Sequence, residues 1–286
     1  MRLVVISGRS GSGKSTALHV LEDEGFYCID NLPAGLLGPL VEQMQQDSSP
    51  ALRGVAVSID ARNTSRDLAL FPSMLQTARL HMDCEVIYLD ASKPTLIKRF
   101  SETRRKHPLS SGDTDLPAAI EAEKKLLEPI ADLASLTIDT SNLNLYQLRD
   151  LVLSRVAKQT NAGLSLQFLS FGYKHGIPVD ADVVFDVRCL PNPYWKPELR
   201  AHSGLDAPVI AFLDSEQQVQ DMLSDVQAYL QKWLPAFKQN RRYLTVAIGC
   251  TGGQHRSVYL CESLQKFFRA EYESTQVRHR ELGAHR

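Results

Sequence analysis

Short apolar runs alternate with longer amphipathic segments in the first half of the chain. The apolar runs are typical of buried strands, and they cover residues 3–7, 26–30, 54–60, 85–90 and 136–139. Segments long enough for helices lie between them, notably Lys14–Glu24, Pro94–Glu102 and Leu116–Ala134. Strands that alternate with helices predict a parallel sheet with right-handed crossovers. Such a sheet places its ligands beyond the carboxyl ends of its strands.

A second pattern begins after a helical stretch from Asn142 to about Lys158. The polar segment 159–163 ends in glycine and predicts a domain boundary. Beyond it we expect strands that begin at Leu164 and Asp182 and end in the proline-containing loops 172–178 and 186–195, a strand over 244–249, and helices over 215–234 and 256–270. Ser215 fits the N-cap of the longer helix, and Gln218 three residues on fits a capping box. The chain thus predicts two domains, residues 1–158 and residues 164–286.

Composition narrows the classes of protein that this chain can be. An apolar content of 43% in 286 residues is ample for packed cores. The five cysteines are widely spread without a CxxC pair, which disfavours a disulfide framework, and the eight histidines show no metal-ligand spacing. The apolar runs are too short to span a bilayer, and the N-terminus lacks the apolar region of a signal peptide. We therefore expect a cytoplasmic protein.

The net charge of −1 hides an asymmetry along the chain. Residues 238–286 carry nine Lys and Arg against four Glu, a balance of +5, which leaves −6 for the rest. A basic end on an acidic body suggests a local anionic partner. The last segment, Arg269–Arg286, interleaves cations with Tyr272, and such residues can neutralise phosphates and stack on unpaired bases. A tail of this kind is nevertheless more often a solvated end.

A phosphate-binding motif follows the first predicted strand. Residues 8–15 fit G-x-x-x-x-G-K-[ST] without a mismatch, and they open a predicted helix, the context that makes the motif specific. Glycines let backbone N–H groups converge on phosphate oxygens, and the helix N-terminus adds positive charge. Lys14 can reach the outer phosphates, and Ser15 can hold Mg²⁺. The predicted nucleotide site comprises Gly8, Arg9, Ser10, Gly11, Ser12, Gly13, Lys14 and Ser15.

Two further features bear on that site. A carboxylate at a strand end usually completes a magnesium site, and the sequence leaves Asp30, Asp60 and Asp90 open for this role. Each of them fits a helix cap or a turn equally well. The segment 99–109 bears four Lys and Arg and precedes loop-forming residues. This pattern is typical of the arginine-bearing lid of small-molecule kinases, with a solvated basic helix end as the alternative.

A second candidate loop lies near the C-terminus. Cys250 and Arg256 have the C-x₅-R spacing of cysteine phosphatases, between a predicted strand and a predicted helix. Catalysis would also need a general acid, for which Asp182, Asp186 and Asp206 are candidates by residue type alone. Phosphate binding without chemistry is the favoured interpretation. A glycine turn capped by Thr251 ranks second, and a phosphatase third.

Six strings of the sequence together resemble the RapZ/YvcJ family of P-loop proteins: VISGRSGSGKS, CIDNLP, DARN, ETRRKHPL, SFGYKHGIPVDADVVFDVRCLPNPYW and VAIGCTGGQHRSV. The resemblance covers essentially the whole chain. It implies an α/β fold, with an N-terminal P-loop NTPase or kinase-like parallel sheet flanked by helices and a smaller C-terminal α/β domain. It also implies ATP at residues 8–15, slow hydrolysis of ATP and GTP, and a GTP-binding segment at Asp60, Ala61, Arg62 and Asn63.

The same resemblance implies a regulatory C-terminal domain. Such a domain would bind small regulatory RNA, present it to RNase E and sense glucosamine-6-phosphate within a homotetramer, thereby controlling amino-sugar synthesis. The sensing pocket falls on Thr251, Gly252, His255 and Arg256, and on Tyr194, where enterobacterial members have histidine. Cys250 and Gly253 complete the predicted sugar-phosphate site. The predicted RNA-binding residues are Arg269, Arg278, Arg280 and Arg286, in a tail less rich in lysine than the enterobacterial one.

Three classes of function compete for this sequence. The first is a nucleotide-binding regulatory adapter, the second a small-molecule kinase with an arginine lid, and the third a cysteine phosphatase fused to a P-loop domain. The basic C-terminal end favours the adapter, and the lid pattern favours the kinase. The family resemblance decides for the adapter.

Overall fold

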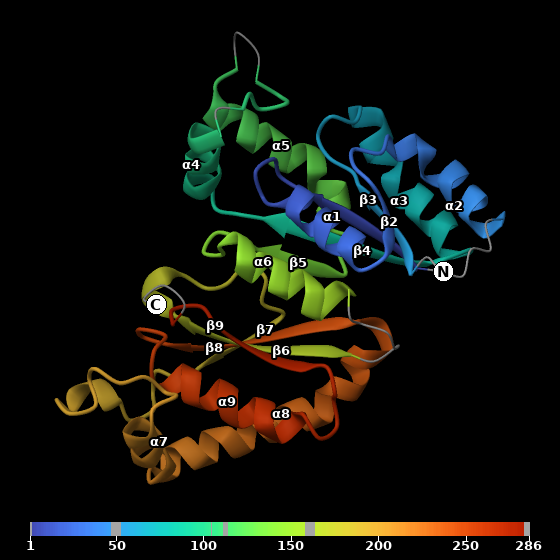
Figure 1. The fold of residues 1–286 in the computed structure, drawn as a ribbon. Coiled ribbons are helices and arrows are strands. Elements are labelled where there is room, and N and C mark those ends of the chain that lie inside the picture. Colours follow the sequence, from blue (N-terminus) through green and yellow to red (C-terminus); the bar gives the residue numbers. More distant parts are fainter. Residues whose placement is uncertain (1, 47–52, 104, 111–113, 158–163, 283–286) are drawn as a thin grey trace. The chain divides into compact units, whose positions relative to one another are not determined.

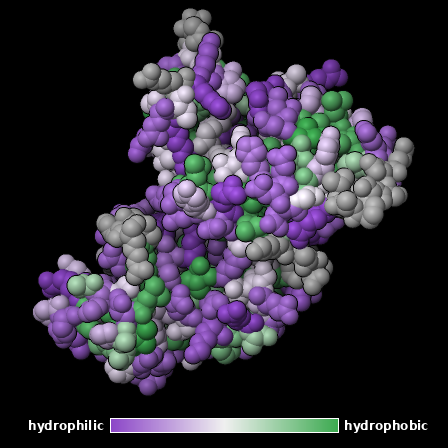
Figure 2. All heavy atoms as spheres, viewed as in Figure 1, coloured by the Kyte–Doolittle hydropathy of each residue, from purple (hydrophilic) through white to green (hydrophobic). Residues whose placement is uncertain are grey.

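The structure is a computed structural model that describes residues 2–46, 53–103, 105–110, 114–157 and 164–282 (Figure 1). The chain divides into two compact units, Met1–Thr160 and Asn161–Arg286, which we call unit 1 and unit 2. The predicted boundary segment, residues 159–163, lies outside the described residues. On the face shown in Figure 2, hydrophilic residues predominate and hydrophobic ones form small groups. Among the described residues, no helix combines the length and apolar character needed to cross a membrane.

Unit 1 is built on a parallel sheet with the strand order β2-β3-β1-β4-β5. The strands are β1 (Arg2–Gly8), β2 (Phe26–Ile29), β3 (Gly54–Ser58), β4 (Asp83–Asp90) and β5 (Leu136–Asp139). All of β3 and nearly all of β1 are buried, as expected for strands covered on both faces by helices. The predicted parallel α/β fold is confirmed, and its central strand β1 delivers the Walker motif to the carboxyl edge of the sheet.

The helices of unit 1 are α1 (Lys14–Asp23), α2 (Leu37–Gln46), α3 (Ser65–Arg79), α4 (Lys93–Thr103), α5 (Leu116–Ala131) and α6 (Leu145–Val152). Polar caps fix where several of them begin, because Thr64 and Asp115 accept hydrogen bonds from backbone N–H groups of the first turns of α3 and α5. A capping box starts α6 at Asn144, and a π-helical turn, Leu153–Ala157, continues it. Helix α5 ends three residues earlier than predicted.

Unit 2 has its own parallel sheet, in the order β7-β8-β6-β9 (Figure 1). The strands are β6 (Ser165–Gly172), β7 (Val183–Asp186), β8 (Tyr243–Cys250) and β9 (Thr275–His279). The helices are α7 (Ala207–Asp214), α8 (Gln217–Asn240) and α9 (Arg256–Phe268). Apolar residues of all three helices pack with alternate residues of β6 and β8, such as Phe168 and Val246, into one core.

Two expectations for unit 2 were wrong, the N-cap of the long helix and the solvated tail. Ser215 does not start the long helix, because its side chain donates to Phe212 O at the end of α7, and α8 follows with Glu216 as its N-cap. The loop expected after the second strand is confirmed, because β7 ends at Asp186, whose carboxylate accepts the backbone N–H and guanidinium of Arg188 and closes a turn. The expectation of a solvated tail fails for residues 275–279, which form the edge strand β9 beside β6.

Candidate phosphate-binding sites

The Walker loop of unit 1 joins β1 to α1, and its glycines are required by the backbone. Gly8, Gly11 and Gly13 have φ angles of 140°, 85° and 107°, which disfavour side chains. A Cβ on Gly8 would also lie only 1.9 Å from Leu89 O of the neighbouring strand. Gly13 is the N-cap of α1 and offers no side-chain cap to the first turn. The backbone N–H groups of that turn are therefore suited to an anion.

Lys14, the first residue of α1, folds its side chain back over the loop. Its Nζ donates to Gly8 O at 2.7 Å and to Arg9 O at 3.3 Å. Burial lowers the pKa of Lys14, and the negative charges of Asp60 and Glu123 oppose that shift. The ammonium group thus lies at the strand side of the loop, among carboxylates that come from other elements.

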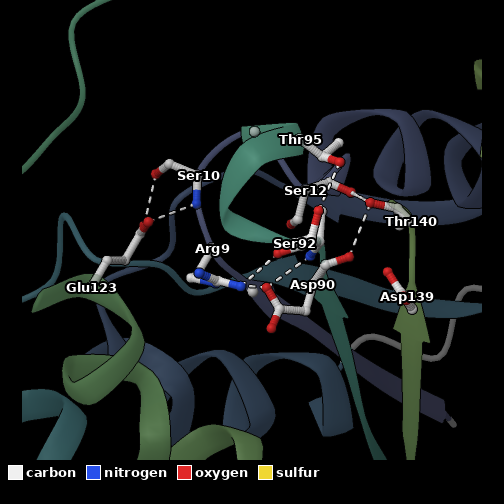
Figure 3. A network of polar contacts seen from close by, with 12 residues as sticks. Arg9, Ser10, Ser12, Asp90, Ser92, Thr95, Glu123, Asp139 and Thr140 are labelled. Carbon is white, nitrogen blue, oxygen red and sulfur yellow. Dashed lines mark hydrogen bonds and ion pairs between the residues drawn. The ribbon is translucent and has the colours of Figure 1, made fainter. Parts of the chain in front are cut away.

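Neighbouring elements hold the Walker loop in place (Figure 3). The guanidinium of Arg9 donates to Asp90 Oδ1 at 2.6 Å and to Ala91 O at 2.5 Å, both at the end of β4. The hydroxyl of Thr140, just after β5, donates to Ser12 O at 3.0 Å. The sequence placed Arg9 and Ser12 in the site but gave no signal for Thr140. Asp90 therefore forms an ion pair with Arg9.

Glu123 of α5 makes a further contact with the loop. Its two carboxylate oxygens accept the backbone N–H of Ser10 at 2.9 Å and the Ser10 hydroxyl at 2.7 Å (Figure 3). His107 lies against the same carboxylate, with 2.9 Å between Nε2 and Oε2, and both side chains are fully buried. Sequence reasoning missed Glu123, which sits in an ordinary helical pattern, and read His107 only as part of a basic segment.

The predicted arginine lid is divided between different roles. Arg99 of α4 donates to Gly11 O at 3.0 Å and to Thr140 O at 2.6 Å, so it braces the Walker loop. Burial lowers the pKa of Arg99, although nearby Asp139 and Glu102 oppose this. Arg105 and Lys106 are exposed, and residue 104 lies outside the described residues. Hence Arg99 acts on the backbone of the loop, and the exposed cations lie on a separate segment.

Residues 60–63 form a turn next to the Walker loop. The carboxylate of Asp60 accepts the guanidinium of Arg62, at 2.7 Å for the shortest contact. Burial raises the pKa of Asp60, but the hydrogen bonds from Arg62 and the charge of Lys14 outweigh it and leave the pKa lowered. Asn63 is used structurally, since its side chain accepts from Ala34 N and donates to Leu32 O. Asp60 thus acts electrostatically on Lys14, and Asp30 lies 3.7 Å from Arg62.

The second loop, residues 250–256, joins β8 to α9. Cys250 is 3% exposed, and its Sγ accepts the N–H of Gly253 at 3.2 Å. The hydroxyl of Ser257 lies 3.2 Å from the same sulfur. The Gly253 N–H therefore points into the loop, toward the thiol. Gly253 adopts a φ of 75°, and an added Cβ would lie 2.4 Å from Glu281 Oε2.

Arg256, the first residue of α9, is buried beneath this loop. Its Nη1 donates to Arg188 O and to Leu190 O, both at 2.8 Å, and its Nη2 donates to Thr251 Oγ1 at 3.3 Å. Within the described residues, Arg256 Nε and His255 Nε2 are buried without a hydrogen-bond partner. Burial lowers the pKa of His255, opposed by hydrogen bonds to the backbone of His202 and Leu199. Two buried nitrogen atoms are thus left to bind a ligand.

The remaining predicted residues of unit 2 have varied surroundings. Tyr194 is 46% exposed, and the guanidinium of Arg200 stacks over its ring. Gly252 has open space where a Cβ would stand. Each candidate general acid has a partner of its own: Asp182 pairs with Arg241, Asp186 with Arg188, and Asp206 accepts from Ser203. No described residue is thereby singled out as the acid of a phosphatase.

Two of the four cations proposed for RNA binding, Arg278 and Arg280, have partners within unit 2. Arg278 lies 3.5 Å from Asp180, and Arg280 pairs with Glu281 at 2.8 Å while donating to Gly176 O. Arg269 is exposed at the end of α9. Arg286 lies outside the described residues. The structure therefore brings Arg280 and Glu281 toward the Cys250 loop, and the sequence gave no indication of Glu281 there.

Comparison with known proteins identifies one family for both units. The model of the RapZ-like N-terminal domain matches residues 1–160, and that of the RapZ C-terminal domain matches residues 164–283. The chain belongs to the RapZ family. A relative from Pseudomonas putida, described as a nucleotide-binding protein, is 59% identical over 284 residues, which cover 99% of this chain and 100% of the relative. A relative from Hahella chejuensis with the same description is 57% identical over 99% of each chain.

Among solved structures, the shikimate kinase of Acinetobacter baumannii is similar in fold. It is 15% identical to this RapZ-family chain, with a TM-score of 0.37. The alignment covers 55% of this chain and 94% of the kinase.

Proposed function

We propose that this RapZ-family protein is a regulatory adapter that binds ATP and GTP through unit 1 and reads glucosamine-6-phosphate and small regulatory RNA through unit 2. The single observation that carries the proposal is the presence of two strand–loop–helix turns, each with a buried cation as the first residue of its helix, Lys14 and Arg256. Backbone donors and a cation at a helix N-terminus are the physical requirements for binding phosphate.

The nucleotide site rests on the Walker loop and on relatives described as nucleotide-binding proteins. ATP would lie along residues 8–15, and the turn 60–63 would contribute to GTP binding. The residues fit Mg²⁺, because Ser15 is exposed in the first turn of α1 and Asp60 is close enough to act on Lys14. Bound Mg²⁺ would neutralise charge on the phosphates. From the family we expect slow hydrolysis of ATP and GTP at most.

The sugar-phosphate site rests on the unpartnered atoms of the Cys250 loop. A buried polar atom without a partner is unfavourable, so a phosphate accepting from Arg256 Nε would be stabilised there, and protonation of His255 would let its Nε2 donate to the phosphate as well. Glu281 Oε2 is also buried without a partner among the described residues, next to Gly253. A carboxylate near a phosphate site suits an amino sugar, whose ammonium group can donate a hydrogen bond to it. These features support glucosamine-6-phosphate as the signal.

RNA binding, delivery to RNase E, a homotetramer and a cytoplasmic location are proposed from the family and from the basic end of the chain. Arg269 is exposed at the end of α9, where it would be able to contact RNA phosphates. The kinase alternative is less well supported, because Arg99 is bound to the Walker loop and to Thr140. A kinase would transfer the γ-phosphoryl group at about 1–100 s⁻¹, whereas an adapter would hydrolyse far more slowly.

The deciding experiment is purification of the full chain from cells, with sequencing of the RNA that copurifies. We expect a small set of RNAs to copurify with the protein and to be lost at high salt. The amount of RNA that stays bound should change when glucosamine-6-phosphate is added. An Arg269→Ala variant should weaken the salt dependence of RNA retention by about one phosphate contact. Absence of RNA together with rapid phosphoryl transfer to a metabolite would favour the kinase instead.

A further inference from the structure

The Walker loop of unit 1 already holds an anion that belongs to the protein. The Glu123 carboxylate accepts both donors of Ser10, the backbone N–H and the hydroxyl, at 2.9 and 2.7 Å (Figure 3). Backbone N–H groups of such loops are the donors that cradle phosphate oxygens. The side chain of Glu123 is fully buried, so its charge acts at short range and with little screening by water. Glu123 therefore occupies donors that a bound phosphate would use.

The position of Lys14 indicates which phosphate is concerned. The lysine of a Walker loop reaches the β- and γ-phosphates. Here its Nζ lies on Gly8 O and Arg9 O, immediately before Ser10 in the chain. The outer end of a bound triphosphate therefore lies next to Ser10. A diphosphate, bound by the helix side of the loop, does not need these donors.

The geometry around His107 shows how Glu123 is held from its other side. The N–H of Leu109 donates to His107 Nδ1 at 3.1 Å, so Nδ1 carries no proton. The imidazole proton is consequently on Nε2, which donates to Glu123 Oε2 at 2.9 Å. The contact is therefore a hydrogen bond in which the His107 ring donates to the Glu123 carboxylate. His107 lies between α4 and α5, in the segment that bears the exposed Arg105 and Lys106.

We infer that Glu123 distinguishes nucleoside triphosphates from diphosphates by competing with the γ-phosphate for the donors of Ser10. A triphosphate displaces the carboxylate from Ser10, and the shift is transmitted to His107 and the segment 105–109. A diphosphate leaves the contact intact. Glu123 is thus a specificity-determining residue, and His107 is the positioning residue behind it. The inference rests on the proposed nucleotide site in the Walker loop.

The test compares the affinities of wild-type protein and Glu123→Gln for ADP and for a non-hydrolysable ATP analogue, by calorimetry on the full chain. Removal of the competing charge should tighten binding of the ATP analogue about 10-fold relative to ADP. Glu121→Gln, an exposed glutamate on the same helix, is the matched control and should change neither affinity. Equal changes for both nucleotides, or weaker binding of the ATP analogue alone, would overturn the inference.

A second measurement follows the transmission to His107 in unaltered protein. Hydrogen exchange over residues 105–110 should increase with the ATP analogue and stay unchanged with ADP, because the Leu109 N–H is bonded to His107. Equal exchange in the two nucleotide states would contradict the inference even where Glu123→Gln fails to fold. Failure of the wild-type protein to bind either nucleotide would instead contradict the proposed function, so the two failures are distinguishable.

Discussion

The two candidate loops share a plan and differ in what holds the cation. Each starts at an interior strand of a parallel sheet, β1 or β8, and ends in a helix whose first residue is the cation, Lys14 or Arg256. Lys14 bonds to two carbonyl groups of its own loop. Arg256 bonds to two carbonyl groups of the segment after β7, almost seventy positions earlier in the chain.

This difference indicates two kinds of anion site. A flexible ammonium on the loop itself can move to follow a phosphate chain, as hydrolysis or exchange requires. A guanidinium fixed by two carbonyl groups keeps one orientation and suits recognition of a single ligand. The first loop is suited to nucleotide binding, and the second to the sensing role that we propose for it. The predictions below test this comparison.

The largest effect is expected from Lys14→Ala. Loss of the buried ammonium should weaken nucleotide binding on the order of 100-fold or more, because it removes charge-assisted hydrogen bonds to the outer phosphates. Sugar-phosphate binding should be largely unchanged, as measured by calorimetry for each ligand. Lys98→Ala, an exposed lysine of α4, is the control. Loss of both nucleotide binding and sugar-phosphate binding in Lys14→Ala would argue that the two ligands share one site.

A smaller effect is expected from Arg256→Lys. Lysine retains the charge, but it lacks the planar guanidinium that donates to Arg188 O and Leu190 O through Nη1 and holds Nε in a fixed position for the ligand. Sugar-phosphate affinity should fall about 10- to 100-fold, with nucleotide affinity unchanged. Thermal unfolding would show whether the variant is folded. An unaltered affinity in a folded variant would contradict the fixed-guanidinium account.

The two units should also differ in their response to acid. Burial lowers the pKa of both His255 and His279 in unit 2, although Glu262 opposes the shift for His279. The stability that these neutral rings provide is complete above about pH 6.5 and is lost as the pH falls below it. In unit 1, the lowered pKa of Asp60 means that its contribution is retained until the pH falls below about 4.

Fluorescence can follow this difference, because both tryptophans, Trp195 and Trp233, are in unit 2. Between pH 6.5 and 4, the midpoint temperature of the unfolding transition seen by tryptophan fluorescence should fall steeply. The midpoint temperature of the remaining far-ultraviolet dichroism change, to which unit 1 contributes, should fall less steeply. His255→Gln should reduce the steepness. Parallel decline of the two signals would refute the assignment to unit 2.

The smallest effect is expected from Cys250→Ser. The sulfur accepts Gly253 N–H inside the loop, and a serine oxygen can accept the same bond. Binding of the sugar phosphate should therefore change by less than about 2-fold, within the range of an interchange of neutral acceptors. A phosphatase activity that depends on Cys250 would show that the sulfur attacks phosphate, and would reverse the interpretation of this loop.

Much of unit 1 could be predicted because its signals are local. The buried strands are unbroken apolar runs, and the Walker motif places a strand end, glycines and a helix start within eight residues. The start of α8 was misplaced for a local reason as well, since Ser215 fits an N-cap equally well whether or not another helix ends there. The strand β9 was missed because an edge strand of five residues carries few apolar positions.

The sequence by itself was enough to predict the two folds, the family and the eight residues of the Walker loop. These predictions rest on local patterns of neighbouring residues, which can be recognised in the chain without knowledge of distant contacts. Only the tertiary structure decided which distant groups surround each loop. Glu123 and Ser10 lie 113 positions apart, and Thr140 and Ser12 lie 128 apart. Such pairs leave no periodicity or spacing in the chain, because the crossover connections of a parallel sheet bring together strand ends and helices that are remote in sequence.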